Sequence, residues 1–358
     1  MTAKDPRSLR ILEIGDRGYF YHRVPEQTTW VWSVKSRLHD EGARPEHKFT
    51  WRLAWELKRR IERGDFDVIF ITYLSIPLFR PEYWLLKNLW NVLRRILFKF
   101  HSLAAYLIFF CQTRDVPIAV IDIWDDPLVR PQYFPFFPRL KRYFKRELPQ
   151  NLWQVFLFTS RRSENLHNIA KQPFLIECGE KIRTFPWVCY EFGDFSAVRP
   201  EEKNMDVFYA GNNANTVRLS GLPQLEKLRA EGWRIDLPSE RLPPDEFQRR
   251  LSRSWLAWSP QGFGWQCTRH YEALMYGAVP VMNYPGIFRY HPLVEGQHAF
   301  YYGCEDDDLV RVLRLALADK ERLQQMVVEG RKHLRQWYST EAVLTYVWNE
   351  LTTPDAAS

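Results

Sequence analysis

The sequence predicts two α/β domains, each built on a parallel, doubly wound sheet with helices on both faces. The chain of 358 residues is longer than one ordinary hydrophobic core requires. Strand-like and helix-like patterns of apolar residues alternate along it, as in parallel sheets with crossover helices. The polar stretch 198–203 interrupts this alternation. We therefore place the first domain at 1–198, the second at 199–335, and a C-terminal helix and tail at 336–358.

In the first domain, short apolar runs alternate with longer amphipathic stretches. Buried parallel strands have continuous apolar runs, whereas helices place apolar residues every three or four positions. We expect helices over residues 28–39, 49–63 and 83–110. We expect strands over Leu9–Ile14, Asp67–Tyr73, Val116–Ile123 and Leu152–Thr159.

The second domain repeats the alternation and ends in a helical tail from Asp307 to Leu351. Glu305–Asp308 supply carboxylates to the first turn of this tail, where the helix dipole favours negative charge. The expected strands of this domain are 206–210, 233–237, 255–259, 278–282 and 298–302.

The segment 255–282 is the most informative part of the chain. A strand ends at Ser259-Pro260, a loop follows at 261–264, and a short helix over 266–276 ends at Gly277. This loop lies where open α/β sheets bind ligands. Its glycines let the backbone approach a ligand closely, and the helix N-terminus offers N–H groups and a positive dipole end to a phosphate. A phosphate-bearing ligand is therefore expected here.

Arg269 and Glu272 are three residues apart and share one face of this helix. A cation near the loop and a carboxylate one turn deeper suit a diphosphate and a ribose diol, although such a pair is also typical of surface salt bridges. The order "Gly-rich loop, then R-x-x-E-A-L-x-x-G-A-V-P-V" resembles the nucleotide-sugar half of GT-B glycosyltransferases, particularly their exostosin-like and spore-coat (CgeB-like) branches. The resemblance is tight across this segment and looser across roughly residues 205–345.

The resemblance implies two Rossmann-like domains that face a cleft, with the last helix crossing back to the N-terminal domain. It also implies that a nucleotide-diphosphate sugar binds to the second domain, as a donor substrate and not as a cofactor. The loop and helix would contact the diphosphate, and the glutamate would bind the ribose. The matching residues here are Gln261, Gly262, Phe263, Gly264, Arg269 and Glu272.

A second loop after the first strand of this domain also faces the expected cleft. Gly211, Asn212 and Asn213 follow that strand, and Arg218 falls in the first turn of the next helix. The asparagines are candidates to hold phosphate or sugar hydroxyls. The alternative is that Asn213 or Asn215 only caps the helix.

The first domain is expected to carry a general base. Retaining GT-B enzymes of one large group have a second Glu eight residues before the ribose Glu, and this chain has Gly264 there. This difference favours inversion, which needs a base to accept the acceptor hydroxyl proton. Asp16 and His22 follow the first strand, and Asp125 and Asp126 follow the strand at 116–123, where the adjacent carboxylates would raise each other's pKa. The alternative is that these aspartates only form turns.

The sequence predicts no metal site. The Asp-x-Asp match at Asp65–Asp67 precedes its strand and therefore lies at the wrong end of the sheet, while Asp306–Asp308 suits a helix cap. Five cysteines are scattered without a CxxC pattern. We expect Arg269, the helix dipole and backbone N–H groups to neutralise the diphosphate instead of a metal.

The net charge of +7 is compatible with anionic nucleotide sugars, phospholipid surfaces or nucleic acid. The amphipathic stretch 83–110 and the basic run 139–146 allow peripheral membrane contact, although core packing and a solvated helix face would explain them as well. The N-terminus lacks the apolar core of a signal peptide, so we expect a cytoplasmic protein, with contact at the inner membrane face as an option.

The expected function is sugar transfer from a nucleotide sugar to a hydroxyl of a glycan, a glycolipid or another cell-surface precursor. One alternative is a nucleotide-sugar epimerase on the same fold. The other is a basic nucleic-acid-binding protein rich in aromatic residues, but no recognised nucleic-acid motif is present, so we expect no such partner.

Overall fold

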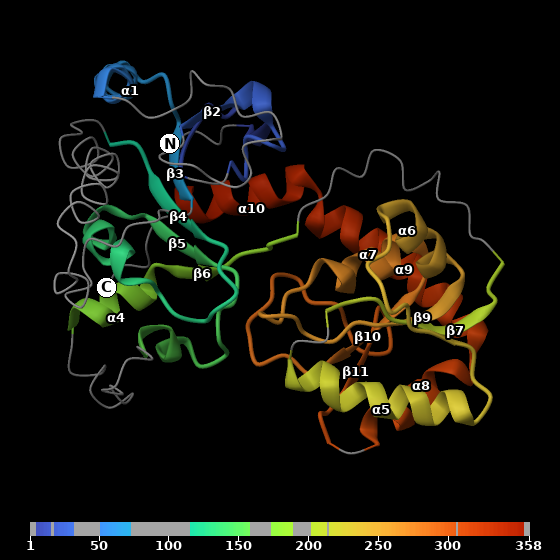
Figure 1. The fold of residues 1–358 in the computed structure, drawn as a ribbon. Coiled ribbons are helices and arrows are strands. Elements are labelled where there is room, and N and C mark those ends of the chain that lie inside the picture. The colour runs from blue at the N-terminus through green and yellow to red at the C-terminus, as the bar shows by residue number, and fades with distance from the viewer. Residues whose placement is uncertain are drawn as a thin grey trace, which may run out of the picture.

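The computed structural model describes residues 5–15, 18–31, 51–72, 115–157, 173–188, 202–212, 215–305 and 307–353. The chain forms two parallel sheets flanked by helices, one in each half (Figure 1). This confirms the predicted α/β class with two doubly wound sheets. The expected helix at 83–110 lies outside the described residues.

The first sheet has the strand order β2-β1-β3-β4-β5-β6. Its central strands are buried along their whole length, which explains their continuous apolar runs. Helices α1 (Trp51–Arg63) and α4 (Pro173–Glu180) belong to this half, and 3-10 turns cover Pro6–Ser8, Pro25–Gln27, Pro131–Arg139 and Leu152–Phe156. The strands are β1 (Ile11–Ile14), β2 (Thr28–Val31), β3 (Val68–Thr72), β4 (Ile118–Asp122), β5 (Arg142–Lys145) and β6 (Ile182–Thr184).

Two predicted elements of the first domain are wrong where the structure describes them. Residues 28–31 form strand β2 instead of starting a helix, because the β-branched run of two threonines and a valine favours extended backbone. Residues 152–156 form a 3-10 helix instead of a strand. A short apolar run of this kind does not distinguish the two states by its pattern.

The basic run 139–146 was expected to form a solvated helix face or a membrane contact. It contains the buried strand β5 instead. Arg142 and Lys145 are buried, and they pair with Glu350 and Asp122. These charges therefore serve the interior of the domain and are not presented to a membrane. Within the described residues, no helix is both long and apolar enough to cross a bilayer.

The second sheet has the strand order β11-β10-β9-β7-β8, and all five expected strands are present. Trp258 on β9 lies in its core, and Gly221 on α5 allows close packing because a Cβ there would lie 2.2 Å from the indole. The strands are β7 (Met205–Phe208), β8 (Ile235–Asp236), β9 (Ser254–Trp258), β10 (Val279–Asn283) and β11 (Phe300–Tyr302). The helices are α5 (Thr216–Ala230), α6 (Pro244–Ser252), α7 (Thr268–Tyr276), α8 (Asp308–Leu317) and α9 (Lys320–Tyr338).

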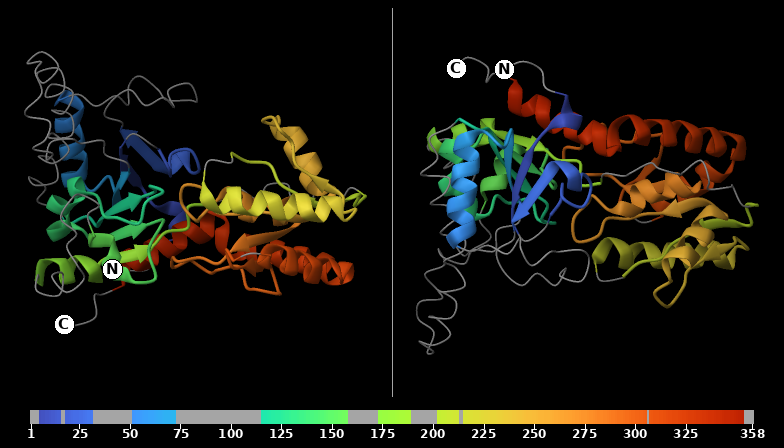
Figure 2. Two further views of the ribbon diagram at one scale, coloured as in Figure 1. Left: turned by 60° about the horizontal axis from the view of Figure 1, so that its bottom comes forward. Right: turned by 90° about the horizontal axis from the view of Figure 1, so that it is seen from above.

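The last helix, α10 (Thr340–Thr352), crosses back to the first domain, as predicted (Figures 1 and 2). Ser339 begins it by accepting a hydrogen bond from the N–H of Ala342 at 3.2 Å. Its apolar face packs in the same cluster as residues of β1, β3 and β4. The residues on that face are Val343, Leu344, Val347, Trp348 and Leu351.

Candidate active site

The loop of residues 261–264, here called the glycine loop, connects β9 to α7. The N–H of Gln261 donates to Asn283 Oδ1 at 2.8 Å, and the Asn283 amide donates back to Gln261 Oε1 at 3.0 Å. The N–H of Gly262 donates to the carbonyl of Gly264 at 2.9 Å. Phe263 points outward with 86% of its surface exposed. The loop is therefore a tight turn held by the neighbouring strand β10.

Helix α7 begins at Thr268 and ends at Gly277, whose φ of 97° lies in the left-handed region that favours glycine. Arg269 and Glu272 lie on this helix, but no ion pair joins them within 4 Å in the described structure. Instead, Arg269 Nη1 donates to the carbonyl of Ala210 at 2.6 Å. Burial raises the pKa of Glu272, against the opposing effect of Arg269. The pair is thus not an ordinary surface salt bridge.

Asn215, at the start of α5, contacts the glycine loop. Asn215 caps α5 by accepting from the N–H of Arg218 at 2.9 Å, as the capping alternative predicted. Its amide also donates to the carbonyls of Gln261 and Gly262, at 3.0 and 2.9 Å. A Cβ at Gly211 would lie 2.1 Å from the Arg269 guanidinium, so glycine makes room for that cation. Asn213 lies outside the described residues.

Two arginines, Arg218 and Arg269, lie beside the glycine loop. Arg218 is only 7% exposed, and it donates to the carbonyl of Gln261 at 3.0 Å and to that of Asn212. Burial and the charge of Arg269 both lower the pKa of Arg218. Among the described residues, no carboxylate forms an ion pair with either arginine. A buried cation and a half-buried cation that repel each other create a site that an anion would stabilise.

A cavity of about 290 Å³ opens between the two domains. The first domain contributes residues from the loop after β4, from the end of β5 and from the segment after β6. The second domain contributes the glycine loop and the first turn of α7. The lining residues are Asp125, Arg146, Trp187, Phe263, Gly264, Cys267, Thr268 and Arg269.

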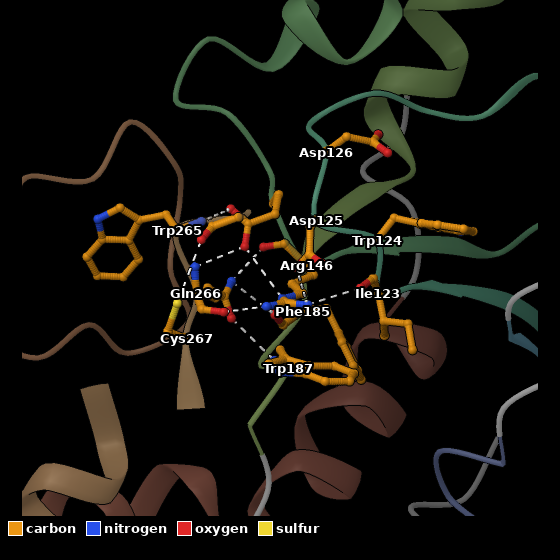
Figure 3. A network of polar contacts seen from close by, with 12 residues as sticks. Ile123, Trp124, Asp125, Asp126, Arg146, Phe185, Trp187, Trp265, Gln266 and Cys267 are labelled. Carbon is orange, nitrogen blue, oxygen red and sulfur yellow. Dashed lines mark hydrogen bonds and ion pairs between the residues drawn. The ribbon is translucent and has the colours of Figure 1, made fainter. Parts of the chain in front are cut away.

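The adjacent carboxylates of Asp125 and Asp126 have different partners. Asp125 lines the cavity and contacts Arg146 at 2.6 Å through Oδ1. Asp126 does not line it, points away from Arg146 in Figure 3 and pairs with Arg130, while it also accepts from the N–H of Leu128 at 3.1 Å. Asp126 thus stabilises the turn, and of the two only Asp125 reaches the cleft.

The loop after β1 is held by Glu13, whose buried carboxylate accepts from the N–H groups of Tyr19, Phe20 and Tyr21 at 2.6, 3.0 and 2.9 Å. Burial raises the pKa of Glu13 to about 7. His22 in this loop is exposed and rests against Trp30, with 5.6 Å between the ring centres, and it does not line the cavity. Asp16 lies outside the described residues.

The acidic residues that resemble metal-binding motifs have arginine or backbone N–H partners. Asp67 contacts Arg10 at 2.8 Å and Asp65 contacts Arg63 at 2.9 Å, beside the amino end of β3. Asp308 accepts from the N–H of Gly303 at 2.6 Å at the start of α8. Within the described ranges, no group of three His, Cys, Asp or Glu side chains gathers as a metal site would require.

Sequence reasoning missed the contacts between the domains around Arg146, Glu147 and Gln266. Arg146 donates to the carbonyls of Ile123, at 3.3 Å, and of Gln266 (Figure 3). The Gln266 amide donates back to the carbonyl of Arg146 at 2.5 Å. Arg146 and Glu147 follow β5 at the carboxyl edge of the sheet, as Asp125 follows β4, but β5 was not predicted as a strand, so the sequence pattern did not mark them.

No protein-family model matches the chain, and a comparison with curated proteins gives no match. Solved structures share its fold. The crystal structure of Anabaena HepE in complex with UDP aligns with a TM-score of 0.52 at 11% identity, covering 96% of this chain and 100% of that one.

Two further structures agree. A Rickettsia africae glycosyltransferase aligns with a TM-score of 0.53 at 8% identity, covering 95% of this chain and 98% of that one. Sucrose-phosphate synthase from Thermosynechococcus elongatus aligns at 0.51 with 10% identity, covering 95% and 98%. The narrower resemblance to exostosin-like and CgeB-like branches stays a prediction. The chain therefore has the GT-B fold of these glycosyltransferases, with two Rossmann-like domains.

Proposed function

We propose that the protein is a glycosyltransferase that moves a sugar from a nucleotide-diphosphate donor to a hydroxyl of a glycan, a glycolipid or another cell-surface precursor. The observation that carries this proposal is the pair of arginines, Arg218 and Arg269, which lie at the glycine loop without an acidic partner among the described residues. Arg269 also lines the cavity that faces Asp125. The fold adds support, since similar proteins include one whose crystal structure holds UDP.

The donor would bind to the second domain. Arg269 and Arg218 neutralise the diphosphate, and the first N–H groups of α7 add partial positive charge. Glu272, largely buried on the same helix face as Arg269, accepts hydrogen bonds from the ribose diol. The sugar then extends into the cavity between the domains, past Phe263 and Gly264.

The acceptor would enter from the first domain. Its hydroxyl oxygen attacks the anomeric carbon while the bond from that carbon to the diphosphate oxygen breaks, and Asp125 takes the hydroxyl proton. Asp125 lines the cavity, and Arg146 holds it through Oδ1 at 2.6 Å, so Oδ2 would be the proton acceptor. A single displacement of this kind inverts the anomeric configuration. The negative charge of the leaving diphosphate falls between the two arginines.

Removing either donor-site charge should weaken nucleotide binding. Glu272→Gln loses a charge-assisted bond to the diol and should weaken UDP binding by about 1.5–3 kcal/mol. Arg269→Ala should weaken UDP binding more than uridine binding, because only UDP carries the diphosphate. Titration calorimetry measures both effects. Arg314→Ala, at an exposed arginine paired with Glu231 on another face, is the matched control and should bind UDP normally.

Unchanged UDP affinity in both donor-site variants would remove this site from the proposal. A salt titration distinguishes the proposed function from a nucleic-acid-binding protein. Nucleic-acid binding weakens steeply with added salt, whereas nucleotide-sugar binding weakens much less. Conversion of a UDP-sugar without any acceptor would indicate an epimerase.

Activity should not depend on a divalent metal, because arginines and the helix N-terminus supply the positive charge at the diphosphate. Once a donor and an acceptor are identified, turnover in excess EDTA should equal turnover without it. Loss of turnover on chelation, restored by Mn²⁺ or Mg²⁺, would overturn this expectation.

A further inference from the structure

The segment after β5, residues 146–150 and here called the β5 extension, belongs to the first domain but bonds to the second. The N–H of Phe288 donates to the carbonyl of Leu148 at 2.7 Å, and the N–H of Gln150 donates to the carbonyl of Gly286 at 3.0 Å. Arg146 donates to Gln266 from the same segment. The β5 extension therefore joins the two domains at the base of the cleft.

Glu147 makes the most specific of these contacts. Its carboxylate accepts hydrogen bonds from the N–H groups of Trp265 and Gln266, at 2.8 and 3.0 Å. Only 4% of this side chain is exposed, and burial raises the pKa of the carboxyl group. A carboxylate out of water is costly unless its oxygens find donors. Arg146 contacts Glu147 Oε1 at 3.5 Å, and the second domain supplies the two N–H donors when the domains are in contact.

Gly264 shows how closely the two domains pack at this point. A Cβ at this position would lie 2.6 Å from the carboxyl carbon of Glu147, nearer than real Cβ contacts come. A side chain at position 264 would therefore have to displace the Glu147 carboxylate, which comes from the other domain. Trp265 and Gln266 come directly between the glycine loop and α7, so fixing their peptide groups sets the direction of both.

We propose that Glu147 is a positioning residue that holds the glycine loop in its nucleotide-binding shape, so that the donor site is complete only while the domains are in contact. This inference rests on the proposed function. Glu147 also occupies the two N–H groups that precede α7. A donor diphosphate is therefore directed to the later N–H groups of the helix and to Arg269.

The test compares UDP affinity of the wild-type chain with that of Glu147→Gln. Glutamine keeps the size of the side chain but turns an NH₂ group towards one of the two N–H donors. UDP affinity should fall by about tenfold, the equivalent of one charge-assisted hydrogen bond. Glu350→Gln is the matched control, since Glu350 on α10 accepts from Arg183 at 2.9 Å and does not line the cavity. It should lower stability and leave UDP affinity unchanged.

A second variant and a double mutant separate positioning from folding. Glu147→Asp keeps the charge but withdraws it from the two N–H groups, and it should weaken UDP binding and speed hydrogen exchange at Trp265 and Gln266. Gly264→Ala should weaken UDP binding in the wild-type chain by much more than in Glu147→Ala, because the clash it creates is with Glu147. Additive effects would contradict the inference.

The outcomes distinguish failure of the positioning role of Glu147 from failure of the proposed function. Failure of the wild-type chain to bind UDP or any other nucleoside diphosphate would overturn the proposed donor site itself. Normal UDP affinity in folded Glu147→Gln and Glu147→Asp would overturn only the positioning role. If neither variant folds, Glu147 is a folding element and the inference also falls.

Discussion

Replacing Asp125 by asparagine should lower turnover by about 10²–10⁴ while UDP affinity stays at its wild-type value. Asparagine keeps the shape of the side chain but cannot accept the proton of the acceptor hydroxyl. Asp125 lies in the first domain, across the cavity from the glycine loop, so removing its charge leaves the donor contacts intact. Steady-state rates with a donor and acceptor pair, combined with calorimetry on UDP, measure the two effects separately.

Asp126→Asn is the matched control for this prediction. It removes a carboxylate one residue away that pairs with Arg130 and does not line the cavity. It should cost some stability of the turn and leave turnover near normal. Near-normal turnover in Asp125→Asn would place the base elsewhere, with Asp16 and His22 as the next residues to replace, or would argue against an inverting mechanism.

Replacing Asp122 by asparagine should lower the free energy of unfolding by about 3–5 kcal/mol, because it leaves the buried charge of Lys145 with the more distant, partly exposed Asp126 carboxylate at 3.9 Å. Both side chains are fully buried, and Lys145 Nζ lies 2.9 Å from Asp122 Oδ2. The Tyr143 hydroxyl donates to the same carboxylate oxygen, at 2.5 Å. Urea denaturation followed by tryptophan fluorescence measures the change.

The double variant Asp122→Asn/Lys145→Met should recover much of this loss, since no buried charge then remains without a partner. Lys227→Met provides the comparison on the surface. Lys227 contacts Asp307 at 2.9 Å with about half of its side chain exposed, so its loss should cost at most about 1 kcal/mol. A small effect in Asp122→Asn, similar to that of Lys227→Met, would show that Lys145 finds water or another partner.

Much of the fold follows from local sequence patterns. The strands of the second domain and Gly277 at the end of α7 were predictable because apolar runs and helix-ending glycines act over a few residues. The glycine loop was predictable for the same reason. The contact that Arg269 makes was not predictable, because its partner Ala210 lies 59 residues earlier in the chain.

The basic strand β5 shows why the rest could not be predicted. Arg142 and Lys145 resemble a solvated face when only neighbouring residues are considered. Their partners, Glu350 and Asp122, lie 208 and 23 residues away, and no local pattern announces them. The interdomain contact of Glu147 with Trp265 spans 118 residues. Sequence reasoning placed the loops at the correct edge of each sheet but could not pair residues across the cleft.

The crossing of α10 makes the order of synthesis matter. Domains generally fold from the N-terminus while the chain is being made. Here Phe70, Ala119 and Ile121 of the first sheet pack against Val343, Val347 and Leu351, which are translated more than two hundred residues later. Until α10 has left the ribosome, that face of the sheet lacks the packing of these three side chains. The first domain to be made is therefore the last to be completed, and a chain interrupted after α9 would carry an open apolar surface into the cell.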